Sequence, residues 1–285
     1  VLQELERVAP VPGKNIKLPL DLDVQLAAIK AMGKRRGAVV AIDPQTGGII
    51  ALASTPSFDP NKFVVGISSK DYNGLRESLD VPLFNRALRG QYPPGSTMKP
   101  FVGLAGLDQG VVDRSYSIKD VGWYQLPNDE RLYRDWKRTG HGKVNLRRAI
   151  IESCDVYFYE LGYKMGIDRM QPLLHQFGFG QNLGLDVPDA LSGLLPDRHW
   201  KKRLRRRSWY AGDTLNMSIG QGFMLATPFQ LAQATAVLAN KGKWNRPRYV
   251  DEVGQYELQP LEVERHADVF LKNPSDWNYM FRAME

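Results

Sequence analysis

Apolar runs separated by turn residues mark the first part of this chain of 285 residues. Within residues 36–54, the runs AVVAI and GIIALA are rich in branched apolar side chains, and the DPQTGG between them has turn composition. We therefore predict two antiparallel strands joined as a hairpin. Residues 1–14 are polar, carry prolines at positions 10 and 12, and indicate a linker.

Helical patterns dominate the chain after this hairpin. They cover about 97–107, then 145–152 and 156–164. Pro100 falls near the start of the first helix, where its missing N–H costs least, and Asn145 can cap the second.

The clearest helix signal comes late in the chain. The stretch TPFQ (227–230) combines an N-cap threonine, a proline at the first helical position and a glutamine three residues after the cap. The helix should run to about Asn240, and Gly242 can terminate it. Residues 113–143 are charged and aromatic without a regular period, so we predict a loop there. Together these elements indicate a mixed α/β (α+β) fold with a helical insert.

Composition fits a globular domain, with 43% hydrophobic and 24% charged residues. No run approaches the roughly 20 apolar residues that cross a bilayer. The net charge is +7, and six cations fall within residues 201–207. We interpret this run as a solvated loop, with contact to an anionic polymer or to membrane headgroups as the alternatives. No known binding motif supports nucleic acid as a partner.

The stretch QYPPGSTMKPF (91–101) carries the first candidate chemistry. Ser96 and Lys99 lie three positions apart, which puts them on one face of a helix. A serine hydroxyl needs a base to act as a nucleophile, and a neutral lysine amine can serve. Backbone N–H groups at the helix start can stabilise an oxyanion. The Ser-x-x-Lys pattern alone is weak, because it occurs by chance in many chains.

Ser153-Cys154-Asp155 forms a second polar box at a break between two predicted helices. The Ser153 hydroxyl could relay a proton between Lys99 and a leaving group, and Asp155 could hold that geometry or bind a substrate amide. The alternative is a cluster of N-cap residues that opens the next helix.

Longer stretches give a more specific indication. FVVGISSKDYNGL (63–75), PLFNRALRGQYPPGSTMKP (82–100) and GLLPDRHWKKRLRRRSWYAGDTLNMSIGQGFMLATPFQLA (193–232) resemble the penicillin-binding protein 2 family, monofunctional transpeptidases that crosslink peptidoglycan during rod elongation. The resemblance covers nearly everything after about residue 15. It implies a penicillin-recognising serine transferase fold across 15–285, in which helices flank a central antiparallel sheet and a helical subdomain is added.

The resemblance also implies roles for individual residues. Ser96 would be the acylated nucleophile, Lys99 its base and Ser153 the hydroxyl of the second box. Asp155 stands where the wider superfamily usually has asparagine, and similar enzymes of the elongation branch also carry aspartate there. The implied reaction is D,D-transpeptidation of stem peptides through an acyl-serine, which β-lactams inhibit and which needs no cofactor.

The family's third box, Lys-Thr/Ser-Gly, does not follow the second box in this sequence. Arg138-Thr139-Gly140 is similar in type but precedes it. The chain ends at Met284-Glu285, in what resembles the region shortly before the third box. We therefore expect the strands that close the sheet to be missing from this chain, which could leave it inactive alone.

The only cysteine, Cys154, lies inside the second box. With Asp120, Asp135 and His141 it supplies a thiolate, an imidazole and two carboxylates, a donor set that suits zinc. From spacing alone, a small buried Cys154 beside a surface His141 is the simpler interpretation. The resembled family includes members with a structural zinc near the second box, so the resemblance favours a structural Zn²⁺ held by these four residues.

Two kinds of alternative remain open. A D,D-carboxypeptidase or a β-lactamase on the same fold would let water attack the acyl-enzyme, and a non-catalytic cell-wall scaffold would use its surfaces alone. By resemblance, the partners are a glycan polymerase and scaffold proteins of the elongation machinery. An N-terminal helix upstream of Val1 would anchor the protein in the bacterial inner membrane, with this domain in the periplasm.

Overall fold

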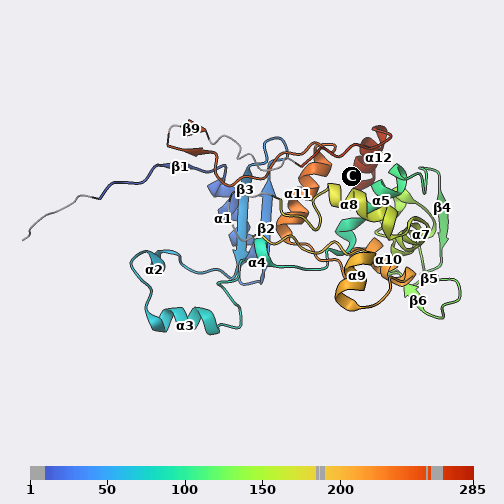
Figure 1. Ribbon diagram of the computed structural model, residues 1–285, viewed down its shortest axis with the longest axis horizontal. Helices are drawn as coiled ribbons and strands as arrows, with labels where there is room; N and C mark the ends of the chain where they lie inside the picture. The colour runs from blue at the N-terminus through green and yellow to red at the C-terminus, as the bar shows by residue number, and fades with distance from the viewer. Residues whose placement is uncertain (1–9, 184–185, 187–189, 255, 258–265) are drawn as a thin grey trace, which may run out of the picture.

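The structure is a computed structural model, and it describes residues 10–183, 186, 190–254, 256–257 and 266–285. The predicted hairpin is present: β2 (Gly37–Ile42) pairs antiparallel with β3 (Ile49–Thr55). Helix α1 (Leu22–Met32) packs along β3 and α11 (Pro228–Ala239) packs along β2, so helices flank the strand pair (Figure 1). The predicted antiparallel sheet with flanking helices is thus present among the described residues as this two-stranded sheet.

The predicted linker, 1–14, is only partly described. Residues 1–9 lie outside the described residues, and residues 10–14 form neither helix nor strand. A small antiparallel sheet follows, in the order β1 (Ile16–Lys17), β8 (Glu252–Val253), β9 (Tyr256–Glu257).

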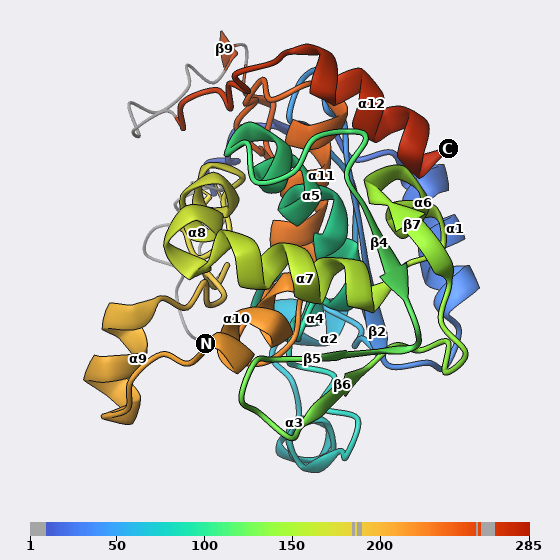
Figure 2. The ribbon, with the colours of Figure 1, turned by 90° about the vertical axis from the view of Figure 1, so that its right-hand side faces the viewer.

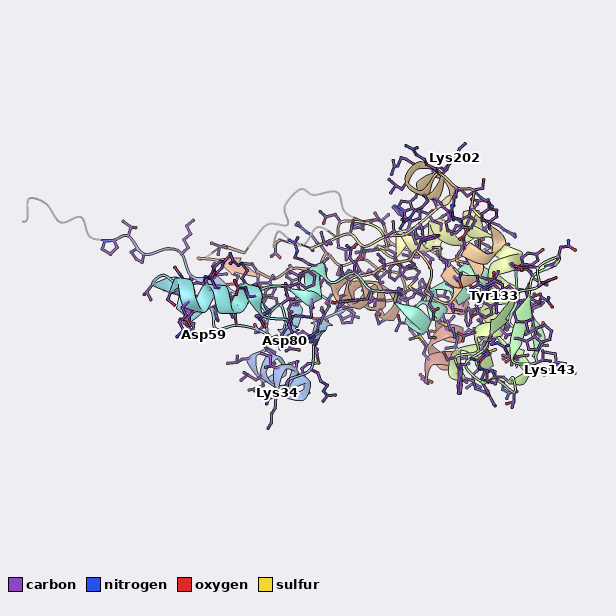
Figure 3. All side chains as sticks on the ribbon, turned by 90° about the horizontal axis from the view of Figure 1, so that it is seen from below. Lys34, Asp59, Asp80, Tyr133, Lys143 and Lys202 are labelled. Carbon is purple, nitrogen blue, oxygen red and sulfur yellow. The ribbon has the colours of Figure 1, made fainter. Side chains whose placement is uncertain are left out.

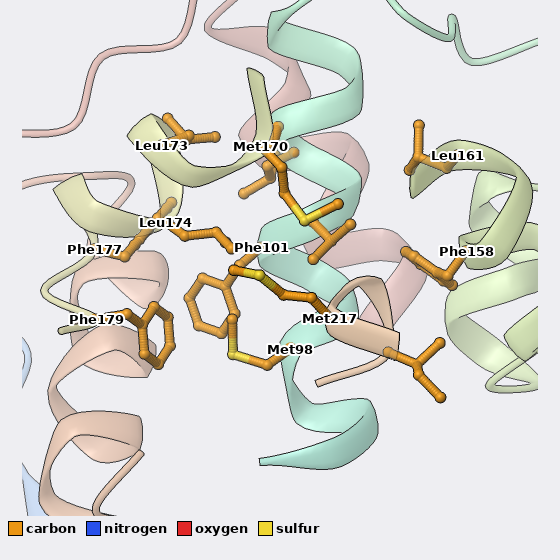
Figure 4. Packing of buried hydrophobic residues seen from close by; sticks show 14 of the residues in the cluster. Met98, Phe101, Phe158, Leu161, Met170, Leu173, Leu174, Phe177, Phe179 and Met217 are labelled. Carbon is orange, nitrogen blue, oxygen red and sulfur yellow. The ribbon is translucent and has the colours of Figure 1, made fainter. Parts of the chain in front are cut away.

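A helical body lies beside the hairpin and encloses α5 (Lys99–Asp108) (Figures 1 and 2). Phe101 on α5 makes edge-to-face contacts with Phe177 and Phe179, with ring centroids 4.9 and 5.3 Å apart (Figure 4). Residues on nearly all sides of α5 are buried, as expected for a helix in the core. The helices around it are α6 (Leu146–Ile151), α7 (Asp155–Met165), α8 (Ile167–Gln176), α10 (Ala211–Ser218) and α12 (Ser275–Met284).

The prediction of a loop over 113–143 is wrong in detail. This segment contributes two small antiparallel ladders, and its strands are too short to give a readable alternation of apolar and polar residues. The ladders pair β4 (Ser117–Asp120) with β7 (Gly142–Asn145), and β5 (Trp123–Gln125) with β6 (Leu132–Arg134).

The interpretation of 201–207 as a solvated loop is also wrong in part. Most of this run lies on α9 (Arg198–Arg205), and Lys201 is buried. The remaining short helices are α2 (Asn61–Val64), α3 (Ser69–Glu77) and α4 (Arg86–Arg89). No helix among the described residues is long and apolar enough to span a membrane.

Helix α11 confirms the capping prediction. Thr227 and Gln230 form the reciprocal capping box at its start. At its end both Lys241, with φ of 52°, and Gly242, with φ of 89°, have a positive φ. The Lys241 N–H donates to Leu238 O at 3.0 Å and the Gly242 N–H to Val237 O at 2.9 Å. The helix therefore ends in a Schellman motif in which Gly242 closes the longer bond.

Candidate active site

Ser96 and Lys99 lie at the junction between a 3-10 turn and the buried helix. The turn η1 (Gly95–Met98) leads directly into α5, and Pro100 falls in the first turn of α5 as predicted. Ser96 is exposed, whereas the Lys99 side chain is only 2% exposed. One end of the Ser-x-x-Lys pair can therefore meet a ligand while the other is enclosed by protein.

Three oxygen atoms of the second box hold the Lys99 amine. Its Nζ lies 2.7 Å from Ser153 O, 3.1 Å from Ser153 Oγ and 2.6 Å from Asp155 Oδ1. An ammonium has three N–H donors, and these contacts match all three. The structure thus brings together Lys99, Ser153 and Asp155 across more than 50 residues of sequence. The Ser96 hydroxyl makes no hydrogen bond with Lys99 or with any other described residue.

Helix capping explains why Ser153 meets Lys99. Helix α6 ends in a Schellman motif: the Cys154 N–H donates to Ala149 O at 3.0 Å, and the Ser153 N–H to Ile150 O at 3.3 Å. Ser153 takes the left-handed position of this motif, with φ of 52°. Cys154 then caps α7, its Sγ accepting a hydrogen bond from the Tyr157 N–H. The N-cap interpretation of this box is therefore correct, and it coexists with the contact to Lys99.

Sequence reasoning missed Gly220, which supports the loop before Ser96. The Gly95 N–H donates to Gly220 O at 2.8 Å. A Cβ on Gly220 would lie 2.1 Å from Gly95 O, and Gly220 has φ of 70°. Only glycine combines this conformation with so close an approach. The paired glycines of SIGQG (218–222) are the signal that could have indicated it.

Asp120, Asp135, His141 and Cys154 form a buried cluster close to the second box. Each offers one possible ligand atom, and these atoms lie within 4.8 Å of one another. The structure thus brings together all four predicted metal ligands as a group that could hold a metal ion. The surface position considered for His141 is wrong, because its side chain is fully buried.

Hydrogen bonds orient the donors of this cluster. His141 Nδ1 lies 2.7 Å from Asp120 Oδ2, and Cys154 Sγ lies 3.4 Å from the same oxygen. His141 Nε2 is buried without a hydrogen-bond partner among the described residues. Burial opposes the charge on Asp120, yet hydrogen bonds from Gly122 and His141 hold the pKa of Asp120 below its ordinary value. Burial raises the pKa of the Cys154 thiol, so in the absence of a cation the thiol stays protonated.

The cluster is connected to the second box through Asp135. Its Oδ2 accepts hydrogen bonds from the Asp155 N–H at 2.8 Å and from the Val156 N–H at 3.1 Å. The carboxylate thereby satisfies two free donors in the first turn of α7. Arg138-Thr139-Gly140 also belongs to this region, because Gly140 approaches the backbone around Gly122. As expected from its order in the sequence, it does not follow the second box.

Comparison with known proteins assigns this chain to a family. The chain matches the family model for the penicillin binding protein transpeptidase domain over residues 37–273. It is 47% identical over 287 residues to the peptidoglycan D,D-transpeptidase MrdA of Acinetobacter baumannii. That match covers 100% of this chain but 42% of the relative, so the chain spans less than half of that protein.

Two solved structures share the fold. A Pseudomonas aeruginosa PBP2 in complex with WCK 5153 has a TM-score of 0.93 at 50% identity, over 98% of this chain and 60% of that one. The Helicobacter pylori complex of PBP2 and MreC has a TM-score of 0.82 at 34% identity, over 94% of this chain and 47% of that one. The predicted fold class is confirmed, and the chain belongs to the penicillin-binding protein transpeptidase domain family.

Proposed function

We propose that the protein containing this chain is a peptidoglycan D,D-transpeptidase with Ser96 as its nucleophile. The observation that carries the proposal is the enclosed Lys99 amine, one helical turn from an exposed Ser96 and in contact with Ser153. A related protein supports the same reaction, since MrdA of A. baumannii is a peptidoglycan D,D-transpeptidase.

The chemistry follows from these positions. The three contacts of Lys99 are those of an ammonium, so Lys99 must first lose one proton to act as a base. As a neutral amine it then takes the proton of Ser96 Oγ while this oxygen attacks the carbonyl between the two terminal D-alanines of a stem peptide. Ser153 Oγ, 3.1 Å from the amine, relays a proton to the leaving nitrogen, and D-alanine departs. The amine of a neighbouring stem peptide then attacks the acyl-serine, forming the crosslink and releasing Ser96. A β-lactam would acylate the same oxygen.

We also propose that the buried cluster holds a structural Zn²⁺. Asp120, Asp135, His141 and Cys154 offer the mixed oxygen, nitrogen and sulfur donors that zinc accepts, and a closed set of four leaves no position for water. A bound cation would offset the cost of burying two carboxylates together and would favour the thiolate form of Cys154. In this role the ion stabilises the connection between β4, β7 and α7 and takes no part in the reaction.

The cellular setting is a further proposal. We place residues 15–285 in a transpeptidase domain in the periplasm, with residues 1–14 as a linker to an inner-membrane anchor. One related structure is a complex of PBP2 with MreC, and another concerns a peptidoglycan synthase complex that coordinates polymerization and crosslinking. These related complexes support a glycan polymerase and a scaffold protein as the partners.

Labelling with a fluorescent penicillin tests the proposed reaction. The full-length protein should retain the label on a denaturing gel, and Ser96→Ala should not. Ser69→Ala, an exposed serine on α3, is the matched control and should label normally. Loss of label within minutes from the parent protein would instead indicate a hydrolase. Equal labelling of Ser96→Ala and the parent would refute the assignment of the nucleophile.

A further inference from the structure

Residues 198–207 carry seven cations and no carboxylate. Arg198 pairs with Asp168, and Lys201 pairs with Asp213. The other five are exposed and make no ion pair or hydrogen bond with any described residue, while Arg205 also lies over the rings of Trp200 and Phe223. We call them the α9 basic surface: Lys202, Arg203, Arg205, Arg206 and Arg207.

Buried contacts hold the helix beneath this surface in place. An isolated helix of eight residues is unstable in water, and like charges three and four residues apart weaken it further. Asp197 caps its start, and Trp200 packs on Phe223 with ring centroids 5.3 Å apart. Lys201 is 4% exposed, and its Nζ lies 4.9 Å from the ring centre of Tyr210. These contacts therefore stabilise a helix that displays a concentrated positive charge on its exposed side.

A groove of about 670 Å³ lies against this helix. Leu195 and Trp200 give it apolar walls, and Lys202 and Arg203 place cations at it. His199 and Asp197 complete the lining, and the Asp197 carboxylate is engaged by the Trp200 N–H at 2.6 Å as the cap of α9. An aromatic face can pack against a sugar ring, while ammonium and guanidinium groups bind carboxylates. The groove thus combines the contacts needed for an anionic glycan that carries peptides.

The chain connects this groove to the loop that supports Ser96. Helix α10 starts at the residues that fix Lys201 and ends just before Gly220, which contacts Gly95. Eight residues of helix span about 12 Å. A polymer several units long could therefore occupy the groove while one of its stem peptides reaches Ser96.

We propose that the groove and the α9 basic surface bind a peptidoglycan strand away from the scissile bond. The strand's sugar rings would pack on the wall formed by Trp200, and its peptide carboxylates would meet the cations of the α9 basic surface. This inference rests on the proposed transpeptidase function and adds a second contact with its substrate. A membrane surface fits less well, because the groove is concave.

Cosedimentation with purified peptidoglycan sacculi tests the proposal on the full-length protein in detergent. The variant Lys202→Gln/Arg203→Gln/Arg207→Gln should bind sacculi roughly tenfold more weakly, as expected for three lost surface charge contacts. The matched control Lys30→Gln/Lys34→Gln/Lys70→Gln removes the same charge from α1, the turn after it, and α3. It should bind like the parent, and Figure 3 shows Lys34 far from Lys202. Thermal unfolding checks that both variants fold.

Each outcome decides between the possibilities. Binding that weakens with salt and is lost when the sacculus carboxylates are amidated supports the proposal. Equal binding by both triple variants overturns it. Preferential binding of phosphatidylglycerol vesicles by the parent, lost in the α9 variant, also overturns it and makes the surface a membrane contact. Penicillin labelling of the parent tests the transpeptidase function separately. A failure of the proposed groove can therefore be distinguished from a failure of the proposed transpeptidase function.

Discussion

Gly220→Ala should slow acylation without touching a reacting group. The substitution adds one methyl group where the backbone of Gly220 meets the backbone of Gly95. The new Cβ would lie 2.1 Å from Gly95 O, whereas real Cβ atoms do not approach closer than 3.0 Å. The backbones of Gly220 and Gly95 must then separate by at least 0.9 Å, the difference between these two distances, and any share of this shift taken by Gly95 displaces the adjoining Ser96.

Two separate costs follow from this geometry. Holding alanine at a φ of 70° costs about 1–2 kcal/mol of folding free energy, because its Cβ crowds the following carbonyl. The clash adds to this, so we expect a total loss of about 2–4 kcal/mol. A displacement of about 1 Å at a reacting group can reduce the rate about a hundredfold. We therefore expect the second-order rate constant for penicillin acylation to fall by roughly that factor.

The measurement is the time course of fluorescent-penicillin labelling together with a urea unfolding curve. Gly110→Ala is the matched control, because Gly110 also has a positive φ, of 62°, but its Cβ would meet nothing within 4 Å. It should lose about 1–2 kcal/mol of stability and acylate within twofold of the parent. Acylation of Gly220→Ala at the parent's rate would show that the loop does not depend on this contact.

Three further changes test the surrounding structure. Asp155→Asn keeps a hydrogen-bond acceptor beside Lys99 but removes the charge 2.6 Å from it; urea unfolding should show a loss of about 1–2 kcal/mol, and unchanged stability would argue against a real ion pair. Removing metal with a chelator should lower the melting temperature by at least about 5 °C in the parent but not in Cys154→Ser, and elemental analysis that finds no zinc in native protein would refute the ion site. Lys201→Ala should cost about 3 kcal/mol by leaving the Asp213 carboxylate without its cationic partner; Asp213→Asn in the same chain, which keeps an acceptor for the Tyr210 N–H, should recover part of this loss, and a purely additive result would exclude coupling between them.

Features that depend on neighbours in the sequence were predictable. The cap of α6 by Asn145, the capping box of α11 and Pro100 at the start of α5 each involve residues within one helical turn. The Ser96–Lys99 spacing follows from the same local geometry. Strands of two to four residues gave no such signal, because pairing such as Asp120 opposite Gly142 is decided by tertiary contacts.

Contacts between distant segments needed more than patterns. The residue types allowed a relay between Lys99 and Ser153 as one of two interpretations, and only the resemblance to a family favoured it, because neither box shows how far it lies from the other. Lys201 was assigned to a solvated run because a cation is rarely buried, and its partner Asp213 could not be recognised without the fold. Gly220 was overlooked because the paired glycines of SIGQG indicate an unusual backbone but do not show which segment approaches it.

The left-handed conformation of Ser153 has a consequence for scanning mutagenesis. Because this residue turns both its carbonyl oxygen and its hydroxyl toward Lys99, a scan that truncates side chains removes one contact and leaves the main-chain contact at 2.7 Å. Ser153→Ala would therefore report only part of what the residue contributes. Ser153→Val, whose branched side chain disfavours a positive φ, should disturb both contacts, and the difference between the two substitutions measures the main-chain share.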